Sequence, residues 1–427
     1  MSAPLARRVA GFGTTIFTEM SALAVQHGAV NLGQGFPDFA GPEFVKQAAA
    51  DAIAADLNQY APMPGLPRLR QAIAAQWELD YGRAVDWQAE VTVTSGATEA
   101  LCGVALGLLD PGDGAIIFEP AYDAYVPDIV MAGATPIPVQ LYPPTKDERA
   151  RYIVPPHIVP PRTTNDESVA DPSSFVLRPS SSWWFDPDEL RAAFARHPKL
   201  VFVNTPHNPT GKVFSRAELE LIAGLCQEYD VLAITDEVYD RLVYDGAEHV
   251  PLATLPGMWE RTLTLNSSGK TFSLTGWKIG YAVGPALLNR ALRQAHQWVT
   301  FATATPLQDA AAVALEQAAA NGYYGQLRAE YDERRLLLRE ILEEVGLPTL
   351  PVQGSYFIST DIGALGFRDD GAFCRFLTTE IGVAAIPTSA FYADPSSAPP
   401  FARFCFAKKR ATLEAARERL QRLPERV

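Results

Sequence analysis

The stretch NSSGKTFSLTGWKIGY, residues 266–281, follows the apolar run RTLTL at 261–265. The run has the composition of a buried strand, and the small residues after it allow the backbone to turn sharply. Such a turn brings the amine of Lys270 into a site, with a second amine at Lys278 eight positions further on. The stretch therefore puts two lysines where a strand of a sheet ends.

Three interpretations of this stretch are open. GKT at 269–271 could end a nucleotide P-loop, but that motif needs a glycine at 264, and Thr264 stands there. Alternatively, Lys270 forms a Schiff base, with Ser267 and Lys278 holding the phosphate of pyridoxal phosphate. The third interpretation is an ordinary strand-to-loop turn whose lysines are solvated.

The composition is that of an ordinary globular protein. The 427 residues are 48% hydrophobic and 20% charged, which suffices for two domains with full cores. A net charge of −13 without a long basic run argues against nucleic acid or an anionic membrane as the main partner. The four cysteines are never spaced as CxxC, and the six histidines show no metal-ligand spacing. We therefore expect a cytoplasmic protein with reduced thiols and no metal, and the N-terminus lacks the apolar core of a signal peptide.

Segments typical of strands and helices alternate along the middle of the chain. Ser215 and Glu218 form a capping box at the start of one predicted helix. We expect strands at 91–94, 115–119, 135–141, 199–204, 231–235, 261–265 and 278–284, and helices at 43–56, 66–82, 121–133 and 215–229, with a turn and helix at 95–109. This alternation predicts an α/β fold in which helices cover both faces of a mostly parallel sheet.

The two ends of the chain differ from this central region. Residues 306–346 have a long helical pattern, and 352–427 have the pattern of a smaller α+β unit. Residues 143–182 are rich in Pro, Ser and Thr without periodicity, which predicts a surface insertion that has no catalytic residue. We expect two domains, a large one at 37–305 and a small one formed by 1–36 and 306–427.

Polar residues follow several of the expected strands at their carboxyl ends. Asn208 lies in NTPHNPTG (204–211), Asp236 ends the strand before EVY, and Lys270 follows RTLTL. SGATEA (95–100) joins a strand to a helix, where small residues let backbone N–H groups reach a phosphate. Open α/β sheets bind ligands at this edge, so the convergence is more informative than any single residue. Taken alone, Asp236 could instead cap the next helix.

A site for pyridoxal phosphate needs a particular set of side chains. Asp236 would keep the pyridine nitrogen protonated, and Tyr239 with Asn208 would contact the phenolic oxygen. Tyr122 could stack on the ring, although an aromatic residue at a helix start is equally ordinary. Arg403, charged amid the apolar neighbours of FARFCFA, could bind a substrate carboxylate through two N–H groups. The alternative for Arg403 is an ion-paired surface arginine on an edge strand.

Together these motifs resemble the fold-type I pyridoxal-phosphate-dependent aminotransferases of class I/II. NPTG, DEVY, SSGKTFSLTGWKIGY and RFCF occur in this order, and the resemblance runs from about residue 12 to the C-terminus, omitting 143–182. NLGQGFPDF (31–39) and NQYAPMPG (58–65) are most similar to the branch that contains kynurenine, methionine and N-succinyldiaminopimelate aminotransferases and cysteine-conjugate β-lyases. The resemblance implies an aspartate-aminotransferase-like fold, with a three-layer α/β/α large domain and a smaller α+β domain.

The resemblance also implies roles for individual residues. Lys270 would be the Schiff-base lysine and Asp236 the pyridinium partner, and Tyr239 would complete the catalytic set. Tyr60 would reach the phosphate of the neighbouring subunit, which implies a homodimer with shared active sites. The other cofactor-binding positions would be Gly96, Ala97, Thr98, Tyr122, Asn208, Ser267 and Lys278, and the substrate-binding positions Gly35, Asn208, Arg403 and Phe17.

Two departures from the family pattern bear on the substrate. Aspartate-specific relatives bind the distal carboxylate with an arginine from the partner subunit, and HQWVTFATATP (296–306) contains none. Trp298 and Phe301 suggest an apolar or aromatic pocket for the substrate side chain, with core packing as the alternative. The kynurenine branch tends to have a histidine after the matching phenylalanine, where Ala302 stands here. A plain dicarboxylate donor and kynurenine itself are therefore disfavoured.

The sequence thus predicts a pyridoxal-phosphate-dependent transaminase. It would move an amino group from an apolar, aromatic or methionine-like L-amino acid, or from N-succinyldiaminopimelate, to a 2-oxo acid such as 2-oxoglutarate. A cysteine-conjugate C–S β-lyase on the same scaffold shares every motif and stays an alternative. A protein that only senses amino acids is a third possibility, and the intact catalytic set and the lack of an appended DNA-binding segment count against it.

Overall fold

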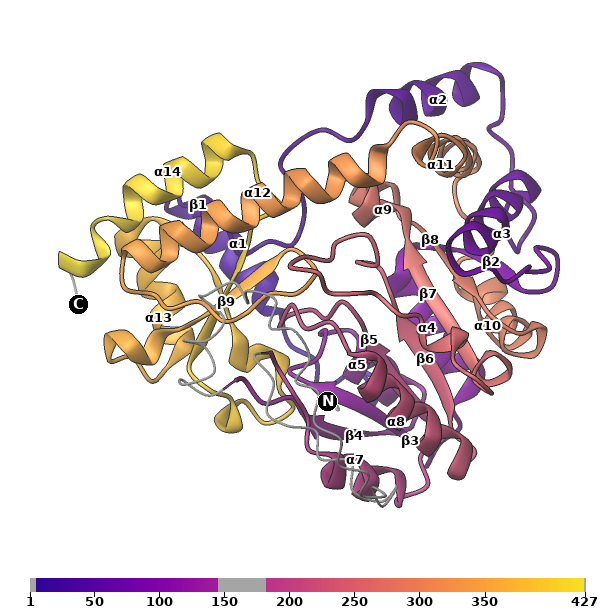
Figure 1. Ribbon diagram of the computed structural model, residues 1–427, viewed down its shortest axis with the longest axis horizontal. Helices are drawn as coiled ribbons and strands as arrows, with labels where there is room; N and C mark the ends of the chain where they lie inside the picture. Colours follow the sequence, from indigo (N-terminus) through magenta and orange to yellow (C-terminus); the bar gives the residue numbers. More distant parts are fainter. Residues whose placement is uncertain (1–4, 145–181, 426–427) are drawn as a thin grey trace, which may run out of the picture.

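The predicted strands lie side by side in one sheet (Figure 1). The computed structural model describes residues 5–144 and 182–425. Within them, a seven-stranded sheet has the order β2-β8-β7-β6-β5-β3-β4. Its strands are β2 (Val91–Ser95), β3 (Gly114–Glu119), β4 (Thr135–Gln140), β5 (Leu200–Asn204), β6 (Leu232–Asp236), β7 (Thr262–Ser267) and β8 (Ile279–Val283). β3 to β7 run parallel and β8 is antiparallel to both neighbours, so the predicted mostly parallel sheet is confirmed.

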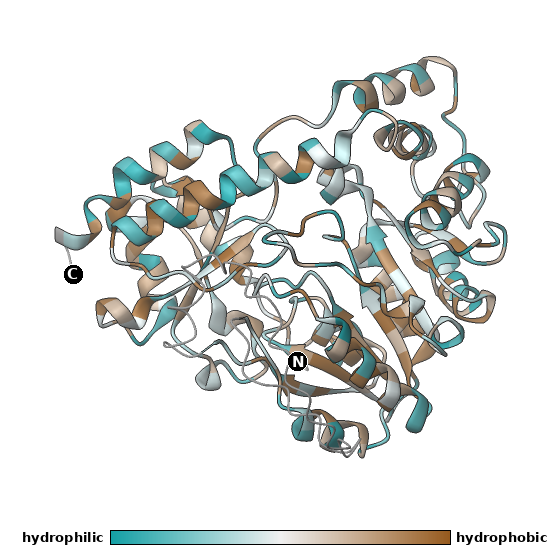
Figure 2. Ribbon diagram, viewed as in Figure 1, coloured by the Kyte–Doolittle hydropathy of each residue, from teal (hydrophilic) through white to brown (hydrophobic). Residues whose placement is uncertain are grey.

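Helices cover both faces of this sheet because successive side chains of a strand point to opposite sides. In β3, Ile116 and Phe118 belong to an apolar cluster with residues of α7 and α8, whereas Ala115 and Ile117 pack with residues of α4, α5 and α10. These helices are α4 (Gly96–Leu108), α5 (Tyr125–Met131), α7 (Pro187–Phe194), α8 (Arg216–Glu228) and α10 (Ala286–Val299). Figure 2 shows the strands of the sheet mainly in brown, as expected for strands buried on both faces.

Some helix bounds differ from the prediction for local reasons. α5 begins only at Tyr125, because the amide of Ala121 donates to the carbonyl oxygen of Phe391 at 2.8 Å and holds this segment outside the helix. The helical pattern of 306–346 divides into α11 (Thr305–Ala318) and α12 (Tyr323–Glu344), since Gly322 between them has a left-handed φ of 73°. α2 (Glu43–Ala54), α3 (Pro67–Tyr81) and the capping box of α8 agree with the prediction.

The N-terminal residues pack with the C-terminal part of the chain. The helix α1 (Ile16–Gln26) leads into β1 (Val30–Asn31), which pairs with β10 (Val383–Ala384). A three-stranded sheet has the order β11-β12-β9 within the described residues; α12 contacts β9 and α13 contacts β11 and β12, while α14 contacts β1 and β10. Its strands and the nearby helices are β9 (Phe357–Asp361), β11 (Ile386–Pro387), β12 (Phe401–Cys405), α13 (Asp370–Phe376) and α14 (Arg410–Leu420).

The domain boundaries expected at 36/37 and 305/306 stay a prediction: the seven-stranded sheet lies within 37–305, and the two smaller sheets consist of strands from 1–36 and 306–427. The expected insertion at 143–182 lies almost wholly outside the described residues. The four cysteines are free. Among the helices of the described ranges, none is long and apolar enough to cross a membrane, and the same ranges hold no cluster of side chains able to bind a metal ion.

Candidate active site

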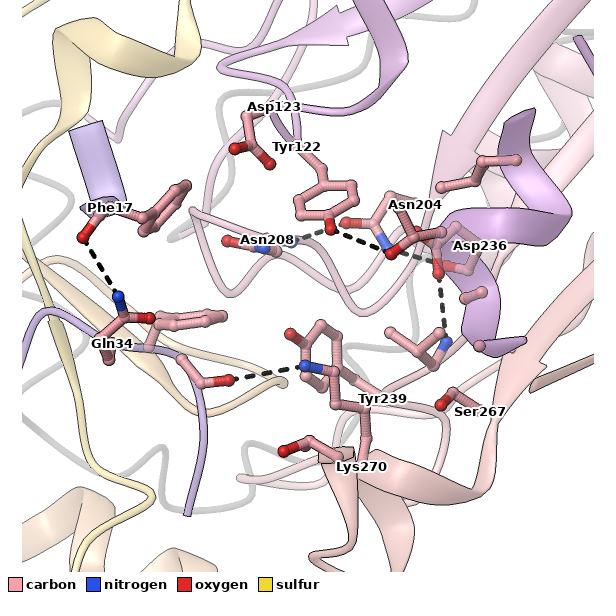
Figure 3. A pocket seen from close by; sticks show the side chains of 18 of the residues that line it. Phe17, Gln34, Tyr122, Asp123, Asn204, Asn208, Asp236, Tyr239, Ser267 and Lys270 are labelled. Carbon is pink, nitrogen blue, oxygen red and sulfur yellow. Dashed lines mark hydrogen bonds between the residues drawn. The ribbon is translucent and has the colours of Figure 1, made fainter. Parts of the chain in front are cut away.

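A cavity of about 310 Å³ lies at the carboxyl ends of β5, β6 and β7, and residues of β9 and β12 close its other side (Figure 3). This is the edge at which parallel α/β sheets bind ligands. The predicted site residues that line it are Phe17, Gly35, Gly96, Ala97, Thr98, Tyr122, Asn208, Asp236, Tyr239, Ser267, Lys270, Lys278 and Arg403. Segments far apart in the sequence therefore meet at this cavity, as the motif analysis predicts.

Lys270 lies in the single helical turn α9 (Ser268–Thr271), which begins where β7 ends. Its amine donates to the hydroxyl of Tyr356 at 2.9 Å and to the carbonyl oxygen of Gly35 at 3.5 Å. Burial lowers the pKa of Lys270 to about 8, and two nearby positive charges also act to lower it. A lowered pKa makes the neutral, nucleophilic amine available near neutral pH. The solvated-lysine interpretation is therefore wrong for this residue.

Asp236 ends β6 at the floor of the cavity and is only 5% exposed. Its carboxylate accepts hydrogen bonds from the hydroxyl of Tyr125 at 2.8 Å and from the amide of Val238 at 3.4 Å. Burial raises the pKa of Asp236 to about 6. The residues after Asp236 form a turn and no helix, so the helix-cap alternative is wrong. Asn204 at the end of β5 fixes the backbone here, because its amide group donates to the Asp236 carbonyl oxygen at 2.8 Å.

A niche for an anion lies at the N-terminus of α4. Gly96 has a φ of 76°, and a Cβ there would lie 3.3 Å from the amine of Lys278. The glycine therefore leaves space in which the Lys278 amine and the first amides of α4 converge. Ser267 lines the same cavity, and its hydroxyl accepts from the amide of Gly269 at 3.2 Å. Amides, a hydroxyl and an ammonium group at one point match the oxygens of a phosphate.

Arg403 is buried in the middle strand of the three-stranded sheet and is 1% exposed, so the edge-strand surface alternative is wrong. Its two terminal nitrogens donate to the side-chain oxygen of Asn208 at 2.9 Å and to the carbonyl oxygen of Gly33 at 3.0 Å. Its Nε is buried without a hydrogen-bond partner among the described residues. The ring centre of Phe357 lies 4.0 Å from the guanidinium carbon of Arg403. Burial lowers the pKa of Arg403 to about 10, so the side chain is charged near neutral pH.

Aromatic side chains flank this guanidinium and line the rest of the cavity. The ring centre of Phe17, from α1, is 5.2 Å from the Arg403 guanidinium carbon. In Figure 3 the Tyr122 ring and the Asp123 carboxylate lie across the cavity from Lys270. Burial raises the pKa of Asp123, while the charge of Arg403 opposes the rise. This part of the cavity thus combines aromatic faces with one acid.

Three aromatic residues named in the sequence analysis lie outside this cavity. Tyr60 is 88% exposed and contacts the ring of Phe301, with ring centres 5.7 Å apart. Trp298 is 81% exposed and Phe301 is 45% exposed, so core packing is wrong for both. Neither lines the cavity of its own chain, and the expected side-chain pocket is not formed by them in this chain. All three side chains are exposed, and the rings of Tyr60 and Phe301 contact each other.

Sequence reasoning missed several residues that contact the predicted ones. Asn204 and Tyr125 flank known motifs: Asn204 starts the NTPHNPTG segment, and Tyr125 follows Tyr122 by three residues. Because Asn204 and Tyr125 lie at or soon after the ends of predicted strands, their position in the sequence could have identified them as site residues. Tyr356 gave no such signal, because it precedes β9 and touches Lys270 across 86 residues of sequence.

Comparisons with known proteins show the family to which the chain belongs. The chain matches the family model of class I and II aminotransferases over residues 28–150 and 166–420. It is 38% identical over 438 residues to kynurenine–oxoglutarate transaminase of Dictyostelium discoideum, covering 98% of this chain and 96% of that protein. It is 39% identical to methionine aminotransferase of Escherichia coli strain K12 over 96% of each chain. The solved structure of N-succinyldiaminopimelate aminotransferase from Mycobacterium tuberculosis has a TM-score of 0.87 at 41% identity, over 98% of this chain and 100% of that one.

The fold and the cavity define the class of protein, a transaminase that uses pyridoxal phosphate. The chain belongs to the family of class I and II aminotransferases. The predicted family, the aspartate-aminotransferase-like fold and the transaminase activity are thereby confirmed.

Proposed function

We propose that this transaminase takes its amino group from an L-amino acid with an apolar, aromatic or methionine-like side chain, or from N-succinyldiaminopimelate, and passes it to a 2-oxo acid, with 2-oxoglutarate as one acceptor. The observation that carries the proposal is that a buried arginine, Arg403, and a lysine with a lowered pKa, Lys270, line one cavity. The printed names of the relatives support the range of donors.

The residues around the cavity fit pyridoxal 5'-phosphate. The niche between Gly96 and Lys278 suits the phosphate, with Ser267 and the amides of Ala97 and Thr98 as further donors. Asp236 suits the ring nitrogen, since a buried carboxylate there favours a positively charged partner. The remaining contacts in this proposal are Tyr122 on the ring face, with Asn208 and Tyr239 at the phenolic oxygen.

The chain's own residues would divide the reaction between them. When bound, the cofactor supplies an electron-withdrawing ring that weakens the bonds at the substrate α-carbon. Lys270 would hold the cofactor and, once released from it, its neutral amine would accept the proton from the substrate α-carbon and later donate a proton to the amino-group acceptor side of the reaction. Arg403, with Asn208 and the Gly35 segment, would bind the α-carboxylate and so fix which α-bond faces the ring. Phe17 would cover the bound substrate.

A homodimer with shared active sites forms part of this proposal. Tyr60 and Trp298 are large aromatic residues with 88% and 81% exposure, which is unusual unless another surface covers them. Tyr60 would then reach the phosphate bound in the partner subunit. In this homodimer, the surface that carries Tyr60 and Trp298 in one subunit would also contribute to the substrate pocket of the other subunit.

Replacing Lys270 by Ala tests the proposal. The Lys270→Ala variant should retain less than about a thousandth of the wild-type turnover, because both the covalent attachment and the proton acceptor are lost. It should also lose the visible absorbance band of the wild-type holoenzyme. Lys46→Ala is the matched control, since Lys46 lies on α2 with a side chain that is 38% exposed. A Lys270→Ala variant with wild-type turnover would end this account.

The two alternatives carry less support. The relatives are named for amino transfer, which favours transamination over β-elimination of a cysteine conjugate. The relatives are named as enzymes, and Lys270, Asp236 and Arg403 meet in one cavity, which favours an enzyme over a protein that only binds amino acids.

A further inference from the structure

The Tyr356 side chain is the nearest hydrogen-bond partner of the Lys270 amine. Tyr356 is fully buried immediately before β9, and its ring packs edge-on against that of Tyr239, with ring centres 4.9 Å apart. The ring of Tyr331 stacks on it, with ring centres 6.1 Å apart. The close packing of these rings fixes the position of the Tyr356 hydroxyl oxygen. That oxygen lies against Lys270 and Gly35, two residues that line the cavity.

The direction of the hydrogen bonds at this hydroxyl is determined by its partners. The hydroxyl lies 2.5 Å from the carbonyl oxygen of Gly35, which can only accept, so Tyr356 donates its single proton there. Its oxygen is then an acceptor toward Lys270, whose amine lies 2.9 Å away. The carbonyl oxygen of Gly35 is a second acceptor at 3.5 Å from the same amine.

A neutral amine has two N–H donors and one lone pair. With both donors directed at Tyr356 and Gly35, the lone pair of Lys270 points away from these two oxygens. That orientation suits an amine that must accept a proton from a substrate in the cavity. The hydroxyl cannot itself take the proton from Lys270, because its oxygen already bears one that is bound to Gly35.

We propose that Tyr356 is a positioning residue, which holds the Lys270 amine whenever this lysine is not covalently joined to the cofactor and leaves its lone pair free for the substrate α-proton. The inference rests on the proposed function of Lys270. It adds a residue from the C-terminal unit to the machinery, and couples the lysine to the Gly35 segment near the substrate carboxylate site.

Tyr356→Phe keeps the ring and deletes only the hydroxyl. We expect kcat to fall about 10-fold, the equivalent of one buried hydrogen bond, because the released lysine loses its fixed acceptor. KM for the amino donor should stay within about 2-fold, since Arg403 and Asn208 are unchanged. The primary isotope effect measured with the α-deuterated donor should rise, because proton transfer becomes the slower step. A merely structural role would leave the isotope effect unchanged.

A second measurement does not depend on turnover. In enzyme loaded with pyridoxamine phosphate, Lys270 is free, and competitive acetylation at a series of pH values, followed by mass spectrometry, reports its apparent pKa. Tyr356→Phe should lower that pKa, because the charged amine loses a hydrogen-bond acceptor. Tyr244→Phe is the matched control: its buried hydroxyl donates to the carbonyl oxygen of Ser355 at 2.8 Å, whereas the hydrogen bonds of the Lys270 amine go to Tyr356 and Gly35. This control should change neither the isotope effect nor the Lys270 pKa.

An isotope effect and a Lys270 pKa that match wild type in Tyr356→Phe would overturn the proposal, as would equal changes in Tyr244→Phe. If Tyr356→Phe does not fold, 3-fluorotyrosine at position 356 keeps the shape and weakens the oxygen as an acceptor, and the same two readouts should shift less far in the same directions. Failure of the proposed function has a different signature. In that case wild-type protein itself would bind no pyridoxal phosphate.

Discussion

Arg403→Lys is the substitution that tests how this chain binds its substrate. Lysine keeps the positive charge, but it replaces a planar group with five N–H donors by a single ammonium. Arg403 already uses two nitrogens to hold Asn208 at 2.9 Å and Gly33 at 3.0 Å, and its Nε has no partner among the described residues. A lysine can keep at most part of these bonds while it also contacts a carboxylate.

The expected loss of substrate affinity follows from the number of hydrogen bonds that residue 403 donates to the substrate carboxylate. A carboxylate that accepts two hydrogen bonds from the guanidinium would accept one from a lysine, and one hydrogen bond to a charged group contributes about 1.5–3 kcal/mol. KM for the amino donor should therefore rise about 10- to 150-fold. Cofactor binding should persist, because Arg403 is separate from the niche at Gly96 and Lys278. The kcat should fall less than kcat/KM does.

Steady-state kinetics with the best donor, combined with titration of the cofactor absorbance by that donor, measure this effect. Arg375→Lys is the control, since Arg375 pairs with Glu19 on the surface and its side chain is 51% exposed. A wild-type KM in Arg403→Lys, with the absorbance titration also unchanged, would refute the assignment of Arg403 to the carboxylate. A lost absorbance band would instead show that the substitution disturbs the cofactor site.

Two further predictions concern the acids of the cavity. Burial raises the pKa of Asp236 from 3.8 to about 6. The charged carboxylate therefore lowers the free energy of unfolding of the cofactor-free protein as pH rises through about 6. The decrease is up to about 3 kcal/mol, from about two pH units at 1.36 kcal/mol each. Asp236→Asn should then raise the Tm of the cofactor-free protein at pH 7.5 and have little effect on it below pH 4, while turnover falls at least about 100-fold. Calorimetry at both pH values measures the change in Tm, and a lower Tm at pH 7.5 would contradict the prediction. Asp123 lines the cavity near Arg403, where its charge should repel a distal carboxylate. Asp123→Asn should therefore raise kcat/KM for glutamate relative to methionine by about 5- to 10-fold, and an unchanged ratio would show that Asp123 does not select the substrate.

The core of the site could be predicted because it depends on strand ends. Asn204 and Asp236 are neighbours in the pairing of β5 with β6, so residues after these strands must converge. A lysine after the next strand then lies at the same edge. Polar residues at these positions are visible in the sequence without knowledge of long-range contacts.

Other features could not be predicted because they depend on how distant segments pack. The hydrogen bond between Lys270 and Tyr356 joins residues that are 86 positions apart in the sequence, and it exists only because the segment before β9 packs beside Lys270. Trp298 follows the buried positions Leu292 and His296 along α10, yet it is exposed, since the helix turns it away from the core of its own chain. The apolar character of a residue does not by itself show whether the residue packs in the core or lies exposed where another subunit can cover it.

The distribution of charge around the cavity restricts the substrates that fit. Within the described residues, the basic side chains that line it are Lys270, Lys278 and Arg403. In the proposed function Lys278 would bind the cofactor phosphate beside Gly96 and Lys270 would hold the cofactor, which would leave Arg403 for a carboxylate. Asp123 adds a negative charge on the side-chain part of the cavity. A second carboxylate of the substrate would therefore meet no further cation among the described residues that line the cavity. This favours donors with an uncharged side chain or with a distal carboxylate that extends beyond the cavity.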